Sequence, residues 1–131
     1  MPTATTETDR NRAAVEEMYG AAKCGDIDKF FSFISADVTV EEPAFLPYGG
    51  TYEGLEGLQK LFGDLASKFD LSGLDFERFV ADGEDFCVIG QIPLAAGADV
   101  VSFIERGVIR DGKVVHLRIY IYDPASLLEV R

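Results

Sequence analysis

The period of the hydrophobic residues changes near the middle of the chain, and this change constrains the fold more than any other feature. Up to about residue 69, apolar side chains recur every three or four positions, as in Val15, Met18, Tyr19 and Ala22, which is the spacing of one helical face. From about residue 74 they form the short, turn-bounded runs that are typical of strands. Helices followed by an antiparallel sheet predict an α+β fold with the helices on one face.

Local signals place the ends of the elements. Gly25 can end the first helix in the left-handed conformation, and Asp26 can cap the second. Pro43 ends the first strand, and Asp111-Gly112 is typical of a two-residue hairpin turn. The expected elements are helices near 15–22, 27–34 and 58–69, strands at 37–42, 74–81, 86–94, 99–110 and 113–123, and a loop at 43–54.

Length and charge limit the classes of protein to consider. The 131 residues suit a single domain over residues 9–131, preceded by a small, polar segment at 1–8 that we expect to be flexible. Twelve Lys and Arg against 23 Asp and Glu give a net charge of −11, which disfavours nucleic acid and anionic membrane surfaces as partners. The N-terminus has no apolar signal core, so a cytoplasmic location is expected.

The last hairpin can be analysed residue by residue. If Asp111 and Gly112 are the two turn residues, an unbroken ladder places Glu105 opposite Arg118 and Phe103 opposite Tyr120. A slip of one residue would exchange the two faces.

One face of this expected hairpin is almost purely aliphatic. It carries Ile104, Val108, Leu117, Ile119 and Ile121. An exposed patch of this kind is uncommon on a monomer, so we expect a homodimer formed through this face. The alternative is that a helix or a terminal segment covers it.

The other expected face mixes charged, phenolic and apolar groups. It carries Phe103, Glu105, His116, Arg118, Tyr120 and Tyr122. Since unpaired buried charges are costly, such a face is typical of a cavity wall. The alternative is a surface ion pair between Glu105 and Arg118, with a structural role for His116 close to the turn.

Several short motifs, taken in order, resemble one known superfamily. They are Gly25-Asp26, the run Ser35 to Pro43, Tyr52-Glu53-Gly54, the run Asp111 to Val114, and the ending Tyr120 to Pro124. Together they resemble the NTF2-like superfamily, in particular its SnoaL-like and ketosteroid-isomerase-like members. The resemblance implies a cone in which three N-terminal helices pack on a strongly curved antiparallel sheet.

The resemblance also implies candidate catalytic residues. The ketosteroid isomerases use a carboxylate just before a proline as the base, and Glu42 of Val40-Glu41-Glu42-Pro43 matches it. Glu105 matches a protonated aspartate of those enzymes. Met18 stands where they have a tyrosine, with Tyr19 one residue further on.

We interpret the sequence as encoding a pocket for a small, apolar, carbonyl-bearing ligand, with proton transfer that needs no cofactor or metal. Glu42 would be the base, Arg118 and Tyr120 would polarise the ligand, and Glu105 would orient Arg118. The alternative is a non-catalytic ligand-binding or dimerisation module. The expected ligand-binding residues are Met18, Tyr19, Phe45, Tyr48, Tyr52, Phe103, His116 and Tyr122.

Overall fold

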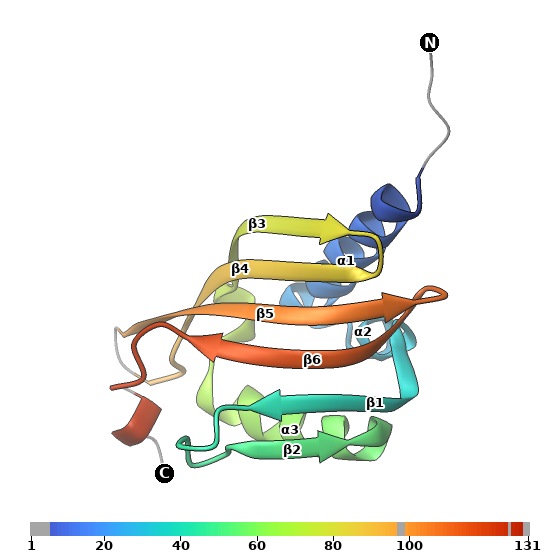
Figure 1. Ribbon diagram of the computed structural model, residues 1–131. Helices are drawn as coiled ribbons and strands as arrows, with labels where there is room; N and C mark the ends of the chain where they lie inside the picture. Colours follow the sequence, from blue (N-terminus) through green and yellow to red (C-terminus); the bar gives the residue numbers. More distant parts are fainter. Residues whose placement is uncertain (1–5, 97–98, 126, 130–131) are drawn as a thin grey trace.

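The computed structural model describes residues 6–96, 99–125 and 127–129. Three helices lie on one face of a six-stranded sheet, behind it in the view of Figure 1. The predicted α+β architecture with N-terminal helices on a curved sheet is confirmed. Within the described ranges, no helix is both long and apolar enough to cross a membrane.

The helices begin and end at the residues expected to cap them. The elements are α1 (Glu7–Cys24), α2 (Ile27–Ser32) and α3 (Gly54–Lys68). Gly25 closes α1 with a φ of 80°, and the Asp26 carboxylate accepts a hydrogen bond from the Lys29 amide at the start of α2. Of the N-terminal segment expected to be flexible, residues 1–5 lie outside the described part, and Glu7 and Thr8 belong to α1.

The sheet has the order β2-β1-β6-β5-β4-β3. All neighbours are antiparallel except β1 and β6, which run parallel. The strand β2 lies inside the segment expected to be a loop, and its four residues leave little pattern to detect. The bounds are β1 (Ile34–Glu42), β2 (Gly50–Glu53), β3 (Asp75–Asp82), β4 (Asp85–Pro93), β5 (Val100–Arg110) and β6 (Lys113–Ile121), with 3-10 turns η1 (Leu71–Gly73) and η2 (Leu127–Glu129).

The turn of the last hairpin is as predicted, but the register beyond it is not. Asp111 and Gly112 both have positive φ, and Ile109 faces Val114. The ladder then skips Val115, so every later partner on β6 moves by one residue. This irregularity makes the predicted pairing wrong over the rest of the hairpin.

The shift exchanges the two faces of β6. Glu105 faces Ile119 and not Arg118, while Arg118 faces Arg106. Leu117 is buried, and Ile119 and Ile121 pack against the core, so these three leave the face expected to form a dimer. In this register the aliphatic side chains of β6 are removed from water, while Arg118 stays in contact with water. This arrangement has the lower free energy, because burying an unpaired charge is costly.

The expected dimer face is therefore wrong as a set. Of its five members, Ile104 and Val108 keep the alternation of the outer strand face, next to Arg106. The expected cavity face is wrong for its members after the turn, because His116, Arg118 and Tyr120 alternate with the inward residues of β6, and Tyr122, just beyond the strand, is exposed. Its β5 members, Phe103 and Glu105, keep the inward orientation.

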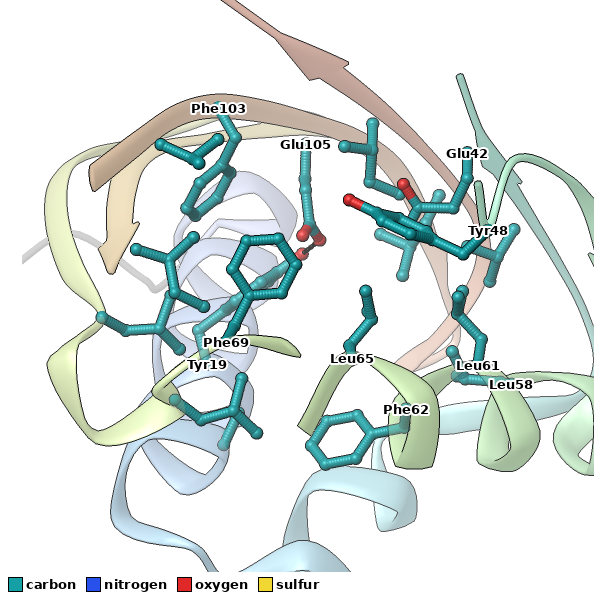
Figure 2. Close-up of a pocket in the computed structure, with 18 of the residues that line it drawn as sticks. Tyr19, Glu42, Tyr48, Leu58, Leu61, Phe62, Leu65, Phe69, Phe103 and Glu105 are labelled. Atoms are coloured by element: carbon teal, nitrogen blue, oxygen red, sulfur yellow. Dashed lines mark hydrogen bonds between the residues drawn. The ribbon is translucent and has the colours of Figure 1, made fainter. Parts of the chain in front are cut away.

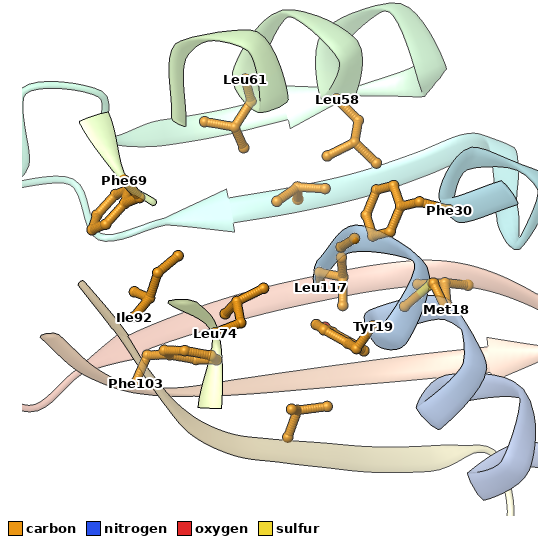
Figure 3. Close-up of a cluster of buried hydrophobic side chains, with 14 of the residues drawn as sticks. Met18, Tyr19, Phe30, Leu58, Leu61, Phe69, Leu74, Ile92, Phe103 and Leu117 are labelled. Atoms are coloured by element: carbon orange, nitrogen blue, oxygen red, sulfur yellow. The ribbon is translucent and has the colours of Figure 1, made fainter. Parts of the chain in front are cut away.

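The core lies between the helices and the inner face of the sheet (Figure 3). α1 packs mainly against β3, and α3 against β1 and β2. Side chains from both helices therefore meet the centre of the sheet from two sides. Buried members include Met18 and Tyr19 of α1, Leu58 and Leu61 of α3, and Phe103 and Leu117 of the sheet.

We predict that Gly107→Ala destabilises the fold. A Cβ at Gly107 would lie 2.2 Å from Cζ of the buried Phe86 ring, so the ring or the strand must move. Overpacking of this kind costs about 1–3 kcal/mol. Chemical denaturation measures the loss.

Gly63→Ala in α3 is the matched control. A Cβ at Gly63 meets nothing within 4 Å, so this change should stabilise the helix by up to about 1 kcal/mol. Equal effects of the two changes would contradict the packing of Phe86 on Gly107.

Candidate functional site

A cavity of about 120 Å³ lies between α1, α3 and the inner face of the sheet. An engineered apolar cavity of roughly 150 Å³ holds benzene, so this space suits a ligand with a single ring. Its wall is mainly hydrocarbon. The aromatic members without a polar group are Phe30, Phe62, Phe69 and Phe103.

Four polar side chains enter this apolar wall from four different segments (Figure 2). Tyr19 comes from α1, Glu42 from the end of β1, Tyr48 from the loop before β2, and Glu105 from the middle of β5. Each carries a group that can hold or donate a proton. The cavity thus combines an apolar ligand environment with acid-base groups, as binding and catalytic pockets do.

The Tyr19 hydroxyl donates a hydrogen bond to the Glu105 carboxyl. Burial raises the pKa of Glu105, and the bond from Tyr19 opposes that rise. Burial, and then the neighbouring Glu105, raise the pKa of Tyr19 well above its ordinary value. The phenol therefore stays protonated and stabilises the ionised form of Glu105.

Glu42 has a different environment. Its side chain is 7% exposed, and no group within residues 6–96, 99–125 and 127–129 hydrogen-bonds to its carboxyl. The carboxyl oxygens face open space in the cavity, because no fully enclosed side-chain oxygen of the described residues lacks a partner. Burial and then repulsion from Glu105 raise the pKa of Glu42 to about 8. At neutral pH, Glu42 is therefore mainly a neutral acid, and a small change in conditions ionises it.

Tyr48 is held by the loop that contains it. The Tyr52 hydroxyl donates to the Tyr48 carbonyl oxygen at 2.7 Å, and the Tyr48 ring meets Phe69 edge-on at 6.4 Å. The loop folds tightly, since a Cβ at Gly49 would lie 2.2 Å from the Pro43 carbonyl oxygen. In Figure 2 the phenol end of Tyr48 points into the cavity between the two carboxyl groups.

The structure brings five of the predicted site residues to the cavity and leaves the others elsewhere. Tyr19, Glu42, Tyr48, Phe103 and Glu105 line it. Met18 and Phe45 were also expected to contact the ligand, but neither lines the cavity. Met18 is fully buried in the core, and the Phe45 side chain is 59% exposed. Tyr52 is half-buried and supports Tyr48 without lining the cavity.

The residues displaced by the register shift make contacts of their own. His116 Nε2 lies 2.6 Å from Glu41 Oε2, and the Arg118 guanidinium stacks on the Tyr120 ring at 5.6 Å. Tyr122 is 89% exposed. The expected polarising role of Arg118 and Tyr120, and the expected Glu105–Arg118 pair, therefore have no place in this cavity.

The sequence analysis missed the wall contributed by α3 and the segment after it. Phe62, Leu65 and Phe69 lie on the apolar stripe of the third helix and its end. The stripe itself was detectable, but the space left beneath it depends on how the helix is placed over the sheet. Among the described residues, no three His, Cys, Asp or Glu side chains gather in a way that could hold a metal ion.

Comparison with known proteins gives a consistent result. The sequence profile of the SnoaL-like domain family matches residues 15–117. No curated protein sequence matches the chain. Similarity to solved structures is extensive, at identities that show the fold alone.

Three of these structures illustrate the similarity. An NTF2-like protein from Burkholderia xenovorans is 22% identical, with 95% of this chain and 96% of that one covered and a TM-score of 0.75. TerC co-crystallised with polyporic acid is 22% identical, with 91% and 98% covered and a TM-score of 0.76. A Kribbella flavida protein named as a candidate ketosteroid isomerase is 18% identical, with 92% and 83% covered and a TM-score of 0.77.

We predict that Glu42→Gln removes a pH-dependent loss of stability. Because the pKa of Glu42 is near 8 in the folded chain and near 4.5 in the unfolded one, ionisation disfavours folding progressively as pH rises from about 4.5 to 8. Urea unfolding at pH 5 and pH 9 should show Glu42→Gln gaining about 2–4 kcal/mol relative to the unmodified protein over that interval.

Glu41→Gln controls for the removal of a carboxyl from the same strand. The hydrogen bond with His116 lowers the pKa of Glu41 from its ordinary value of 4.5, so the stability that this carboxyl contributes is lost only at pH values below that range. Glu41→Gln should therefore leave the change in stability between pH 5 and pH 9 nearly unaltered. A Glu42→Gln protein that gains nothing between pH 5 and pH 9 would contradict the assigned environment of Glu42.

Proposed function

Because the chain belongs to the SnoaL-like domain family, we propose that its cavity binds a small, apolar, carbonyl-bearing molecule and moves a proton on it. The observation that carries the proposal is the Glu42 carboxyl, which is buried, has no hydrogen-bond partner among the described residues, and faces an apolar cavity. A carboxyl in such a place has the pKa that general acid-base chemistry near neutral pH requires.

The proposed reaction is enolisation. Ionised Glu42 takes a proton from the carbon next to the carbonyl, so that a C–H bond breaks and an O–H bond forms on Glu42. The electron pair left on carbon forms the C=C bond of the enolate, and the carbonyl oxygen gains the charge. Return of the proton to the same or another carbon completes an exchange or an isomerisation.

The other polar groups take supporting roles in this proposal. The Tyr48 hydroxyl enters the cavity and is positioned to donate to the developing oxyanion. The Tyr19–Glu105 pair acts on Glu42 from a distance, because the charge on Glu105 raises the pKa of Glu42 and so makes it a stronger base. These roles replace the ones first expected for Arg118 and Tyr120.

A non-catalytic binding module is the second candidate. One observation favours it: the Tyr19 hydroxyl is already engaged by Glu105, so it is not free to stabilise an oxyanion. The cavity would then bind its ligand without turnover. The names of the structural relatives, which include a candidate ketosteroid isomerase and a protein crystallised with polyporic acid, do not decide between the two.

We also propose a homodimer through the outer face of the sheet, with membership corrected by the observed register. Large apolar side chains remain exposed on or beside this face, and a groove crosses it at Ile89, Ile104 and Tyr120. Exposed apolar side chains gathered on one face favour association. The exposed members are Val80, Val100, Ile104, Tyr120 and Tyr122.

We predict that the protein accelerates hydrogen exchange at the methyl group of acetophenone, a one-ring enolisable ketone. In D₂O, ¹H NMR should show the rate rising with pH to a plateau above about pH 8, as Glu42 ionises. Glu42→Gln should slow the exchange by at least about 100-fold, and Glu41→Gln should leave it unchanged. A rate that is independent of Glu42 would exclude the proposed reaction.

We predict that sedimentation detects a dimer at micromolar concentration. Ile104→Glu places a charge in the proposed interface and should weaken association by at least about tenfold, the equivalent of 1.4 kcal/mol. Ala66→Glu, on the exposed side of α3, should not. An unmodified protein that remains a monomer would exclude the interface.

A further inference from the structure

The ionisable groups described in the cavity wall are all acids. They are the carboxyls of Glu42 and Glu105 and the phenols of Tyr19 and Tyr48. No Lys, Arg or His side chain belongs to the described lining. Lys68 of α3 forms an ion pair with Asp64 at 2.9 Å and is not part of the lining. A bound ligand therefore meets acids from α1, β1, β5 and the loop before β2, with no cation to balance them.

The environment of Glu42 indicates that this group of acids binds a ligand. The Glu42 side chain is more than nine-tenths buried, lacks a hydrogen-bond partner in the described part of the chain, and points into the cavity, with the Tyr48 hydroxyl between it and Glu105 (Figure 2). Native proteins normally pair buried carboxyls with a donor or a cation. The missing partner of Glu42 is thus a group that the ligand can supply.

We infer that this cavity selects cations, and that its preferred ligands are small aromatic or alicyclic amines bound as ammonium ions. An ammonium group offers three donors and no acceptor, which complements two carboxyls. Glu105 accepts one bond from Tyr19 and retains acceptor capacity for a second donor.

The apolar wall supports the same ligand class. Aromatic faces attract cations, and Phe69, Phe103 and Tyr48 all line the cavity. A volume of about 120 Å³ limits the ligand to a small molecule of about one ring. Anionic ligands of the same size are disfavoured, because they would place negative charge among two carboxyl groups in a site that has no basic group in its described lining.

The inference rests on the same cavity as the proposed function but requires no turnover. A ketone that also carries an amine would satisfy both, since the ammonium would bind at the carboxyl pair and hold the carbonyl within the site. The two claims nonetheless have separate tests, because acetophenone carries no charge and an amine without a carbonyl cannot enolise.

Isothermal titration with three probes of matched shape tests the inference. At pH 7, benzylamine should bind at least about tenfold more tightly than benzyl alcohol, as expected for a charged in place of a neutral hydrogen bond. Benzoate should not bind measurably. Glu42→Gln should reduce benzylamine affinity by about tenfold and leave benzyl alcohol affinity within about twofold.

The control variant is Glu41→Gln, which makes the same substitution at the neighbouring residue of β1 on the opposite face of the sheet. It should leave the preference for benzylamine intact, and circular dichroism should show that both variants are folded. The inference is overturned if benzyl alcohol binds as tightly as benzylamine, or if Glu41→Gln weakens benzylamine as much as Glu42→Gln does. Exchange of acetophenone with no amine preference would overturn it while sustaining the proposed function.

Discussion

The carboxyls of Glu42 and Glu105 share one apolar cavity, and of the two only Glu105 accepts a hydrogen bond from the described residues, from the Tyr19 hydroxyl. This bond stabilises the ionised form of Glu105, and Glu42 lies in the same apolar space with no donor of its own in the described chain. Two ionised carboxyls in one apolar site repel each other strongly. Burial, and then this repulsion, raise the pKa of Glu42 to about 8. Both proposed properties of the site, proton transfer and selection of cations, follow from this environment.

A single skipped residue on β6 determines which side chains share that space. With Val115 outside the ladder, Leu117, Ile119 and Ile121 face the core, and Glu105 meets hydrocarbon in place of Arg118. An arginine opposite Glu105 would have lowered the pKa of both carboxyls and neutralised the site. The irregularity thus keeps the cavity apolar and acidic, and moves the arginine to the outer face beside Tyr120.

Much of the fold was predictable because its signals are local. Gly25-Asp26 and Asp111-Gly112 specify a cap and a turn through their own backbone preferences, and the helical stripes locate the core. Glu42 and Glu105 were found through resemblance to a family motif. The register was not predictable from turn geometry alone, although the cost of burying Arg118 and His116 while exposing Leu117 favoured the observed faces. The Tyr48 contribution depends on the three-dimensional path of the loop.

The most direct test of this account is the titration of Glu42 by ¹³C NMR of its side-chain carboxyl. The account predicts an apparent pKa near 8 in the folded protein, which moves toward the ordinary value of about 4.5 when Glu105 is replaced by Gln. A pKa near 4.5 in the unmodified protein would show that Glu42 is solvated or paired, and would contradict the acidic cavity on which the proposed chemistry depends.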